Sequence, residues 1–378
     1  TYEFDWPVHD HREKEALLSV LERKKWFNGE EVIAFEKAYA EFQGAAFGVA
    51  CTSGTTAIEI VLEALEIGPG DEVIVPPYTF VATATAVLRV GATPVFADVD
   101  ASWCMDPAAT EAAITSKTKA IMPVHFGGSM ANIEALKTLA EQHNIELIED
   151  ACHAWGSQLK GQGASTIGHC GVFSFQESKN ITAGEGGIIV TNDEDLAARC
   201  RSIVNCGREE GAAWYHHINL GTNARLTEFG AALLRVQLER YPEQMAVREA
   251  RAATLDAGLG AIPGIIPQPS APTMTRRSYH LYCIRFDEEQ FGMDRDTFLA
   301  AVDTAGLPVV AGYPLPLYKQ PLFQKFLDRH DYNACQCPVT EALCASEGLW
   351  VQQTMLLLSE SHMTGIVDSI ASIQAGSR

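Results

Sequence analysis

A lysine and an aspartate, 29 residues apart, stand where reactive side chains are expected. Asp150 follows the apolar run 145–148 and one further acidic residue, so it lies at the carboxyl end of an expected buried strand. Lys179 follows the apolar run 172–175 and precedes a glycine-rich turn, and it alone of the eleven lysines lies between two expected core strands. A lysine among apolar neighbours loses its proton readily, as the formation of an imine with a carbonyl carbon requires.

The role of the aspartate has two interpretations. A carboxylate at a strand end can hold a proton on a pyridine nitrogen and so turn the ring into an electron sink. The same carboxylate can also cap a following helix. Of the two neighbouring acids, we expect Glu149 to be the one in solvent.

Two further strand-to-helix junctions offer ligand contacts. Residues 51–56 (CTSGTT) combine hydroxyl groups with the free amides of a helix start, which suits a phosphate, although such a sequence can equally be a simple helix cap. In residues 75–80 (VPPYTF), Phe80 could stack on a bound ring or belong to the core.

Alternating strand and helix patterns predict an α/β fold. Seven apolar runs are expected to be strands: 46–50, 72–75, 93–97, 120–125, 145–148, 172–175 and 188–190. Helical patterns fill most gaps, which implies a mainly parallel sheet with ligands at the carboxyl ends of its strands. A long helix from Glu228 to Leu259, bent at Pro242, then leads into 261–275, which we expect to be a connector. We therefore expect a large domain over 1–250, with two helices at its start, and a small α/β domain over 251–378.

Composition narrows the class of function. A formal net charge of −20 repels polyanions and argues against nucleic acids and anionic membranes as partners. The ten cysteines are scattered, and no signal peptide or membrane-length apolar run is evident, so we expect a cytoplasmic protein with reduced thiols. No cysteine or histidine spacing indicates a metal site.

Seven segments, in order between residues 26 and 235, resemble the DegT/StrS family of sugar and cyclitol aminotransferases. They are TSGTTA, GDEVIVPPYTF, GATPVFADVD, AIMPVHFGG, IEDACHAWG, FSFQESKNITAGEGG and LGTNARLTEFGAA. The resemblance implies the fold-type-I architecture of pyridoxal 5'-phosphate (PLP) enzymes, with a large seven-stranded domain and a smaller C-terminal domain. It also implies transfer of an amino group from glutamate or glutamine to a keto-sugar or keto-cyclitol, in amino-sugar, aminocyclitol or antibiotic biosynthesis.

The resemblance also assigns roles to individual residues. It implies that Lys179 carries the cofactor covalently, that Asp150 contacts its ring nitrogen and that His153 lies near the ring. The other cofactor contacts that it implies are Gly54, Thr55, Thr56 and Ser174 at the phosphate and Phe80 against the ring.

The same resemblance implies a homodimer. Asn223 matches the residue that reaches the phosphate of the neighbouring subunit's cofactor, so the active sites would be shared. Arg225 and Phe27 resemble elements near that interface and, with Tyr318, are candidate substrate contacts. Two positions depart from the family: Thr56 is often alanine, and many nucleotide-sugar members have histidine in place of Tyr318. The segment around Lys179 looks closer to scyllo-inosose aminotransferases and aminohydroxybenzoate synthases.

Three alternatives remain open. A 3-amino-5-hydroxybenzoate-type synthase, which dehydrates and aromatises its substrate, also keeps the lysine, whereas the family's dehydratases replace it with histidine. A PLP-binding regulatory protein without turnover would need many of the same residues. A nicotinamide enzyme is disfavoured because no GxGxxG follows the first strand.

Overall fold

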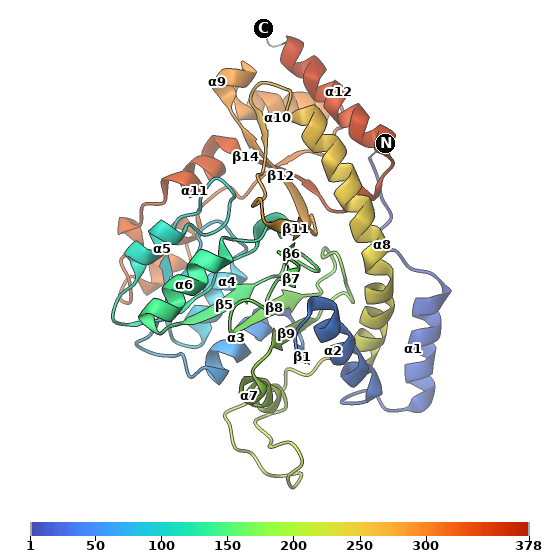
Figure 1. Cartoon of the computed structure of the whole chain (residues 1–378), viewed down its shortest axis with the longest axis vertical. Coiled ribbons are helices and arrows are strands. Elements are labelled where there is room, and N and C mark those ends of the chain that lie inside the picture. Colours follow the sequence, from blue (N-terminus) through green and yellow to red (C-terminus); the bar gives the residue numbers. More distant parts are fainter. Residues whose placement is uncertain (1, 377–378) are drawn as a thin grey trace.

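A seven-stranded sheet lies at the centre of the N-terminal part of the chain in the computed structural model, which describes residues 2–376 (Figure 1). The strand order is β1-β9-β8-β5-β4-β2-β3. Strand β9 runs antiparallel to β1 and β8, and the other neighbouring pairs are parallel. The strands are β1 (Phe47–Cys51), β2 (Glu72–Val75), β3 (Thr93–Phe96), β4 (Thr118–Ile121), β5 (Glu146–Asp150), β8 (Cys170–Ser174) and β9 (Gly187–Thr191). The predicted seven-stranded, mainly parallel sheet is confirmed.

Helices cover both faces of this sheet because alternate strand residues point to opposite sides. In β2, Val73 and Val75 pack in one apolar cluster, and Ile74 between them packs in the other. The first cluster includes helices α3 (Gly54–Ala64), α4 (Ala82–Arg89) and α7 (Glu194–Val204). The second includes α2 (Glu30–Gln43), α6 (Ile133–His143) and the first half of α8 (Glu228–Leu259), with α5 (Pro107–Ala113) against it.

A second, antiparallel sheet of four strands lies beyond the large one, and α8 runs continuously through Pro242 from one to the other (Figure 1). Its strand order is β10 (Ile265–Pro267), β12 (Leu281–Phe286), β14 (Gly348–Gln352) and β13 (Val310–Ala311). Helices α9 (Glu288–Phe291), α10 (Arg295–Thr304) and α12 (Glu360–Gly376) belong to this part of the chain, which has its own apolar cluster.

The expected connector 261–275 is not structureless. It contains β10 and the start of β11 (Met274–Arg276), which joins β6 (Gln158–Leu159) and β7 (Gln162–Gly163) in a three-stranded sheet. Its prolines fit because the strands are short and peripheral. The remaining elements are short helical turns: η1 (Phe126–Gly128), η2 (Leu317–Lys319), η3 (Phe323–Phe326), η4 (Tyr332–Ala334), α11 (Pro338–Ala342), η5 (Leu343–Glu347) and η6 (Met355–Leu357).

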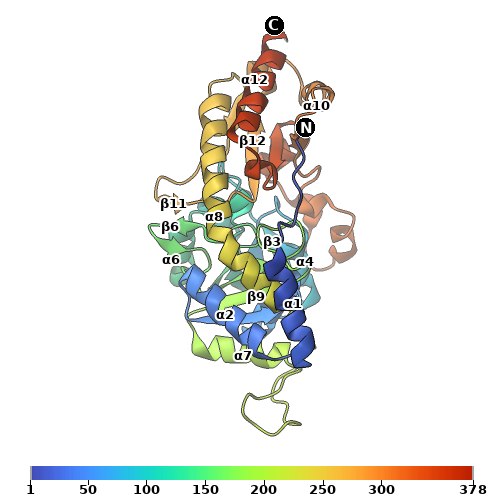
Figure 2. The same cartoon turned by 90° about the vertical axis from the view of Figure 1, so that its right-hand side faces the viewer.

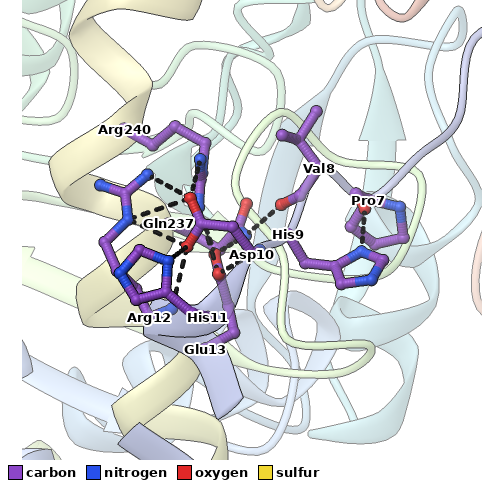
Figure 3. A network of polar contacts seen from close by, with 9 residues as sticks. All are labelled: Pro7, Val8, His9, Asp10, His11, Arg12, Glu13, Gln237 and Arg240. Atoms are coloured by element: carbon purple, nitrogen blue, oxygen red, sulfur yellow. Dashed lines mark hydrogen bonds and ion pairs between the residues drawn. The ribbon is translucent and has the colours of Figure 1, made fainter. Parts of the chain in front are cut away.

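A polar network fixes the N-terminal segment against α8 (Figure 3). Helix α1 (His11–Arg23) begins with a capping box formed by Asp10 and Glu13. Arg240 of α8 donates to Glu13 at 2.8 Å, and Gln237 donates to the Val8 carbonyl at 2.8 Å and to Glu13 at 2.9 Å. Because these contacts are largely buried, they hold residues 6–13 along α8 rather than leaving them as a loose arm.

Candidate active site

A cavity of about 450 Å³ opens between the large sheet and the C-terminal part of the chain. One side, the large-sheet wall, is formed by Ser53, Gly54, Thr55, Thr83, Asp150, Cys152, His153, Ser174 and Lys179. The opposite side, the small-sheet wall, is formed by His280, Leu281, Tyr313, Trp350, Gln352 and Gln353. Most of the large-sheet wall lies at or just beyond the carboxyl ends of strands, where open α/β sheets bind ligands.

Lys179 lies in the loop between β8 and β9, and its Nζ lies 5.9 Å from the centre of the Trp155 ring. Burial lowers the pKa of this amine, because an ammonium group loses solvation there. Interactions with Cys152 and Asp150 act in the opposite direction but do not cancel the effect. Lys179 is therefore placed as a nucleophilic amine at the cavity wall.

Asp150 ends β5, and its carboxylate is buried at the cavity. Its Oδ2 accepts a hydrogen bond from Thr83 Oγ1 at 2.8 Å, and its Oδ1 accepts one from the Cys152 amide at 3.2 Å. No helix begins directly after Asp150 among residues 2–376, so the helix-cap interpretation is wrong. Thr83 was missed from the sequence because its role depends on how α4 packs beside β5.

The expectation for Glu149 is also wrong, since its side chain is 0% exposed. It accepts hydrogen bonds from the amides of Ser165 at 2.7 Å, Ile167 at 3.0 Å and Gly168 at 2.6 Å. His125 Nε2 lies 2.8 Å from the same carboxylate. Because side chains alternate between the two faces along a strand, Glu149 points to the side opposite Asp150. There its hydrogen bonds fix the 163–168 loop.

Two imidazole rings, tilted by 42° to each other, contact one another at the cavity. The rings of His153 and His280 are 4.3 Å apart, and burial lowers the pKa of both, with a further contribution from the charge of Lys179. Both rings are therefore neutral near pH 7. His153 Nδ1 accepts from the Gly127 amide at 3.4 Å, and His280 Nδ1 lies 2.9 Å from Asn180 Oδ1. His280 was missed from the sequence because nothing around it marks a reactive side chain.

The start of α3 offers a site for an anion. Ser53 caps this helix by accepting from the Thr56 amide at 3.1 Å, which removes Thr56 from the set of free donors, and Thr56 does not line the cavity. Gly54 and Thr55 do line it, and amides in a first helical turn have no acceptor within their own helix. A Cβ on Gly54 would lie 2.8 Å from the Cβ of Ser174, so this position requires glycine.

The remaining candidates divide into one at the cavity and four away from it. Phe80 lines the cavity and is 58% exposed. Asn223 and Arg225 lie on the chain segment after α7, and the Arg225 guanidinium lies 5.4 Å from the centre of the exposed Phe27 ring. Tyr318 is 2% exposed and donates to Glu341 at 2.6 Å. Within one chain, these last four do not line the cavity.

Two searches of the described residues bear on other kinds of site. Within 2–376, no three histidine, cysteine, aspartate or glutamate side chains are grouped so as to hold a metal ion. In the same range, no helix has both the length and the apolar character needed to cross a membrane.

Comparisons with known proteins agree with this geometry. The DegT/DnrJ/EryC1/StrS aminotransferase family model matches residues 7–371. A putative L-glutamine:3-amino-2,3-dideoxy-scyllo-inosose aminotransferase from Streptomyces kanamyceticus is 36% identical, covering 98% of this chain and 93% of its own. A 3-amino-5-hydroxybenzoate synthase from Amycolatopsis mediterranei is 37% identical, covering 97% and 96%. A crystal structure of 3-amino-5-hydroxybenzoic acid synthase superposes with a TM-score of 0.90 at 36% identity, covering 99% of both chains. The chain therefore belongs to the DegT/DnrJ/EryC1/StrS family and is a PLP-dependent aminotransferase.

Proposed function

We propose that this enzyme transfers an amino group from glutamine or glutamate to a keto-cyclitol or keto-sugar. The observation that carries the proposal is the placement of the Lys179 amine and the Asp150 carboxylate on one wall of a single cavity. The names of the relatives support the substrate class, since the Streptomyces relative is described as using L-glutamine and an amino-dideoxy-scyllo-inosose. By the same reasoning we place the reaction in aminocyclitol, amino-sugar or antibiotic biosynthesis.

The residues of the large-sheet wall fit PLP in chemical type and position. The amides of Gly54 and Thr55, with the Ser174 hydroxyl, would hold the phosphate at the positive end of the α3 dipole. Asp150 would hold the ring nitrogen, and Lys179 would carry the cofactor covalently. His153 and Phe80 would contact the ring, while Thr56 would act only through the cap of α3.

The chain's own groups then move the protons. Bound PLP supplies a carbonyl carbon and an electron sink that hold the amino group between the two substrates. With PLP bound, the unprotonated Nζ of Lys179 would take the proton from the donor's Cα in the first half-reaction and would return a proton to the acceptor's carbon in the second. Asp150 would hold the proton on the ring nitrogen, and the hydrogen bond from the Thr83 hydroxyl would maintain the orientation of its carboxylate.

Synthase chemistry is the second candidate because the Amycolatopsis relative and the solved neighbour both carry that description. The two activities differ in the mass of the product. A keto-cyclitol should gain an amino group, whereas an aminodehydroquinate-type substrate should lose water and become aromatic. Mass spectrometry of both reactions separates the candidates.

We also propose a homodimer with shared active sites. The loop after α7 extends away from the rest of the molecule (Figures 1 and 2), and on it Trp214 is 74% exposed and Leu220 is 92% exposed. Apolar side chains in such a position suit burial against another copy of the chain. Asn223, exposed near the base of this loop, would reach the partner's phosphate site, with Arg225 and Phe27 at the same interface.

Subunit mixing tests this arrangement. Lys179→Ala and Asn223→Ala should each be inactive or strongly impaired as homodimers. Refolded together, they should recover part of the activity, because one of the two sites in a mixed dimer then contains neither change. A mixture no more active than its components would contradict shared sites.

The domain boundary and the location are further parts of the proposal. We propose that the chain divides near residue 250, since residues 252–370 contribute a separate apolar cluster. Residues 317–337 return to the large sheet, where Phe96 contacts the rings of Tyr318, Phe323 and Tyr332. We propose a cytoplasmic location because all ten cysteines are free thiols, as expected in a reducing compartment.

The decisive experiment is chemical. Borohydride treatment of the protein loaded with PLP should attach the cofactor irreversibly to the peptide that contains Lys179. Addition of L-glutamine should convert the cofactor's absorbance to that of its amine form, and a keto-cyclitol should restore it. A bound cofactor that no amino donor converts would instead favour a regulatory protein.

A further inference from the structure

A buried arginine without an acidic partner lies directly behind the small-sheet wall. Arg248, on α8, is 0% exposed, and burial lowers its pKa to about 10. No carboxylate of the described chain lies within ion-pair distance of it, and its Nη1 has no hydrogen-bond partner within residues 2–376. Burying a charge without a counter-charge is costly, so the positive charge of Arg248 favours an anion nearby.

The arginine is linked to the cavity through a single side chain. Arg248 Nε donates to Gln353 Oε1 at 3.1 Å, and Nη2 donates to the same oxygen. Because a guanidinium has only donors, these two bonds fix which end of the amide faces Arg248. The Gln353 Nε2 group must therefore face away from the arginine, and it lies 3.4 Å from the carbonyl oxygen of Ser178, the residue that precedes Lys179.

Within one chain, the charged groups around the cavity offer the donor's carboxylate no direct cationic partner. Among the described residues that line the cavity, Asp150 and Glu185 have acidic side chains and Lys179 has the one lysine or arginine side chain. The amine of Lys179 must be neutral to react. His153 and His280 are held neutral by burial. An amino-acid donor brings a carboxylate one bond from the carbon that reacts, so the group that binds it must lie close to Lys179.

We propose that Gln353, oriented and polarised by Arg248, binds the α-carboxylate of the amino donor. The inference rests on the proposed aminotransferase function and adds a donor subsite to it. Gln353 Nε2 contacts the carboxylate directly, whereas Arg248 is a positioning residue that also supplies positive charge from behind. The proposed acceptor is a neutral polyhydroxy ketone, which the positive charge does not attract. The Gln353–Arg248 pair therefore lets the enzyme distinguish the two substrates that bind one after the other in the same cavity.

A purely structural role is the competing explanation for Arg248. Its guanidinium lies 5.7 Å from the centre of the Trp6 ring and 5.9 Å from that of Tyr241, which favours a cation between aromatic faces. Trp6 also donates to the Glu177 carbonyl at 2.7 Å, so the arginine could serve to hold the N-terminal segment over the lysine loop. The test must therefore distinguish loss of the donor subsite from loss of this packing.

Gln353→Glu distinguishes the two explanations. The change gives Arg248 a carboxylate partner and should keep or raise the thermal unfolding temperature, yet it repels a carboxylate substrate. We expect the apparent KM for L-glutamine and L-glutamate to rise about tenfold to a hundredfold, as for loss of a charge-assisted hydrogen bond. The half-reaction with the keto acceptor, starting from the amine form of the cofactor, should change less than about threefold.

A donor without a carboxylate provides the second measurement. The amine 4-aminobutanamide is glutamine with its α-carboxylate removed, and the parent enzyme should discriminate strongly against it. Gln353→Glu should reduce that discrimination, because only glutamine loses a contact. If the variant slows both amines equally, or leaves the KM for glutamine unchanged, the subsite is rejected. If no amino donor converts the parent enzyme, the proposed function fails instead.

Arg248→Gln completes the design, with Arg251→Gln as its matched control. Arg251 lies one turn further along α8 and donates to the Leu358 carbonyl at 2.9 Å, away from the cavity. Binding of 2-methylglutamine, which has no Cα hydrogen to lose, measures donor affinity without turnover. Arg248→Gln should weaken it about tenfold or more and Arg251→Gln should not. If Arg248→Gln fails to fold, Gln353→Glu still decides the question.

Discussion

The two walls of the cavity depend on different features of the fold. Asp150 and Ser174 are the last residues of β5 and β8, and Gly54 follows β1 by three residues, so the large-sheet wall is fixed by where the strands end. The small-sheet wall comes from one end of the two central strands of a separate sheet, where His280 precedes β12 and Gln353 follows β14. The groups that we propose to hold the cofactor thus depend on local strand geometry, and those that we propose to contact substrates depend on how the small sheet packs against the large one.

This difference has a kinetic consequence. Both half-reactions use the same bound cofactor, so a change in the large-sheet wall should impair amination by the donor and transfer to the acceptor alike. A change in the small-sheet wall should impair the half-reaction whose substrate it contacts. The ratio of the two half-reaction rates therefore reports to which wall a residue belongs.

The largest effect is expected from Lys179→Ala. Removing the covalent attachment and the proton carrier should slow both half-reactions by about a thousandfold or more. Borohydride should no longer fix the cofactor to the protein. Lys160→Ala, which removes an exposed lysine paired with Glu134 at 2.7 Å, is the control. Near-normal turnover of Lys179→Ala would reject the assignment of this residue.

A substantial effect confined to one half-reaction is expected from Trp350→Ala. The indole lies in the small-sheet wall with its ring 5.1 Å from that of Tyr313 in an edge-to-face arrangement, and we expect it to contact the ring of the acceptor. Its loss should weaken acceptor binding about tenfold, through the apolar contact area removed. Stopped-flow measurement of each half-reaction checks this, and an equal loss in both would break the distinction between the walls.

How far the sequence could predict the site follows from the same distinction. The strand that ends at Asp150, and the strand that precedes the Lys179 loop, follow from apolar runs that a parallel sheet would bury. Glu149 was misplaced because adjacent strand residues face opposite sides, so being next to a reactive acid says nothing about exposure. Gln353 and Trp350 had no local signal, since neither the strand β14 nor its packing against the lysine loop is visible as a period in the sequence.

A smaller effect, equal in both half-reactions, is expected from Thr83→Val. The change keeps the shape of the side chain but removes the hydroxyl that donates to Asp150 at 2.8 Å. Losing one such bond costs about 1 kcal/mol, so cofactor affinity and both rates should fall roughly fivefold. Thr85→Val, two residues along the same helix, should leave them unchanged. Unequal loss would mean that Thr83 also contacts a substrate.

The smallest effect is expected from a change at His169. This residue lies outside both walls, so the change should alter the stability of the protein but neither half-reaction. Hydrogen bonds to Glu146 and, at 3.0 Å, to Asp193 raise the pKa of His169 to about 9. A folded-state pKa above the unfolded value of about 6.5 means that the stabilisation is complete below pH 6.5 and is lost as the pH rises through 9.

His169→Gln should therefore lower the free energy of unfolding by about 1 kcal/mol at pH 6, a modest value because the two acids are partly solvated. The deficit should shrink towards pH 10, as measured by urea unfolding across that range. His143→Gln, at the exposed end of α6, is the matched control. A deficit that is constant with pH would show that the His169 ring contributes packing alone. A change in either half-reaction rate would show that the network beneath β5 reaches the cavity, and the separation between site and scaffold would then be incomplete.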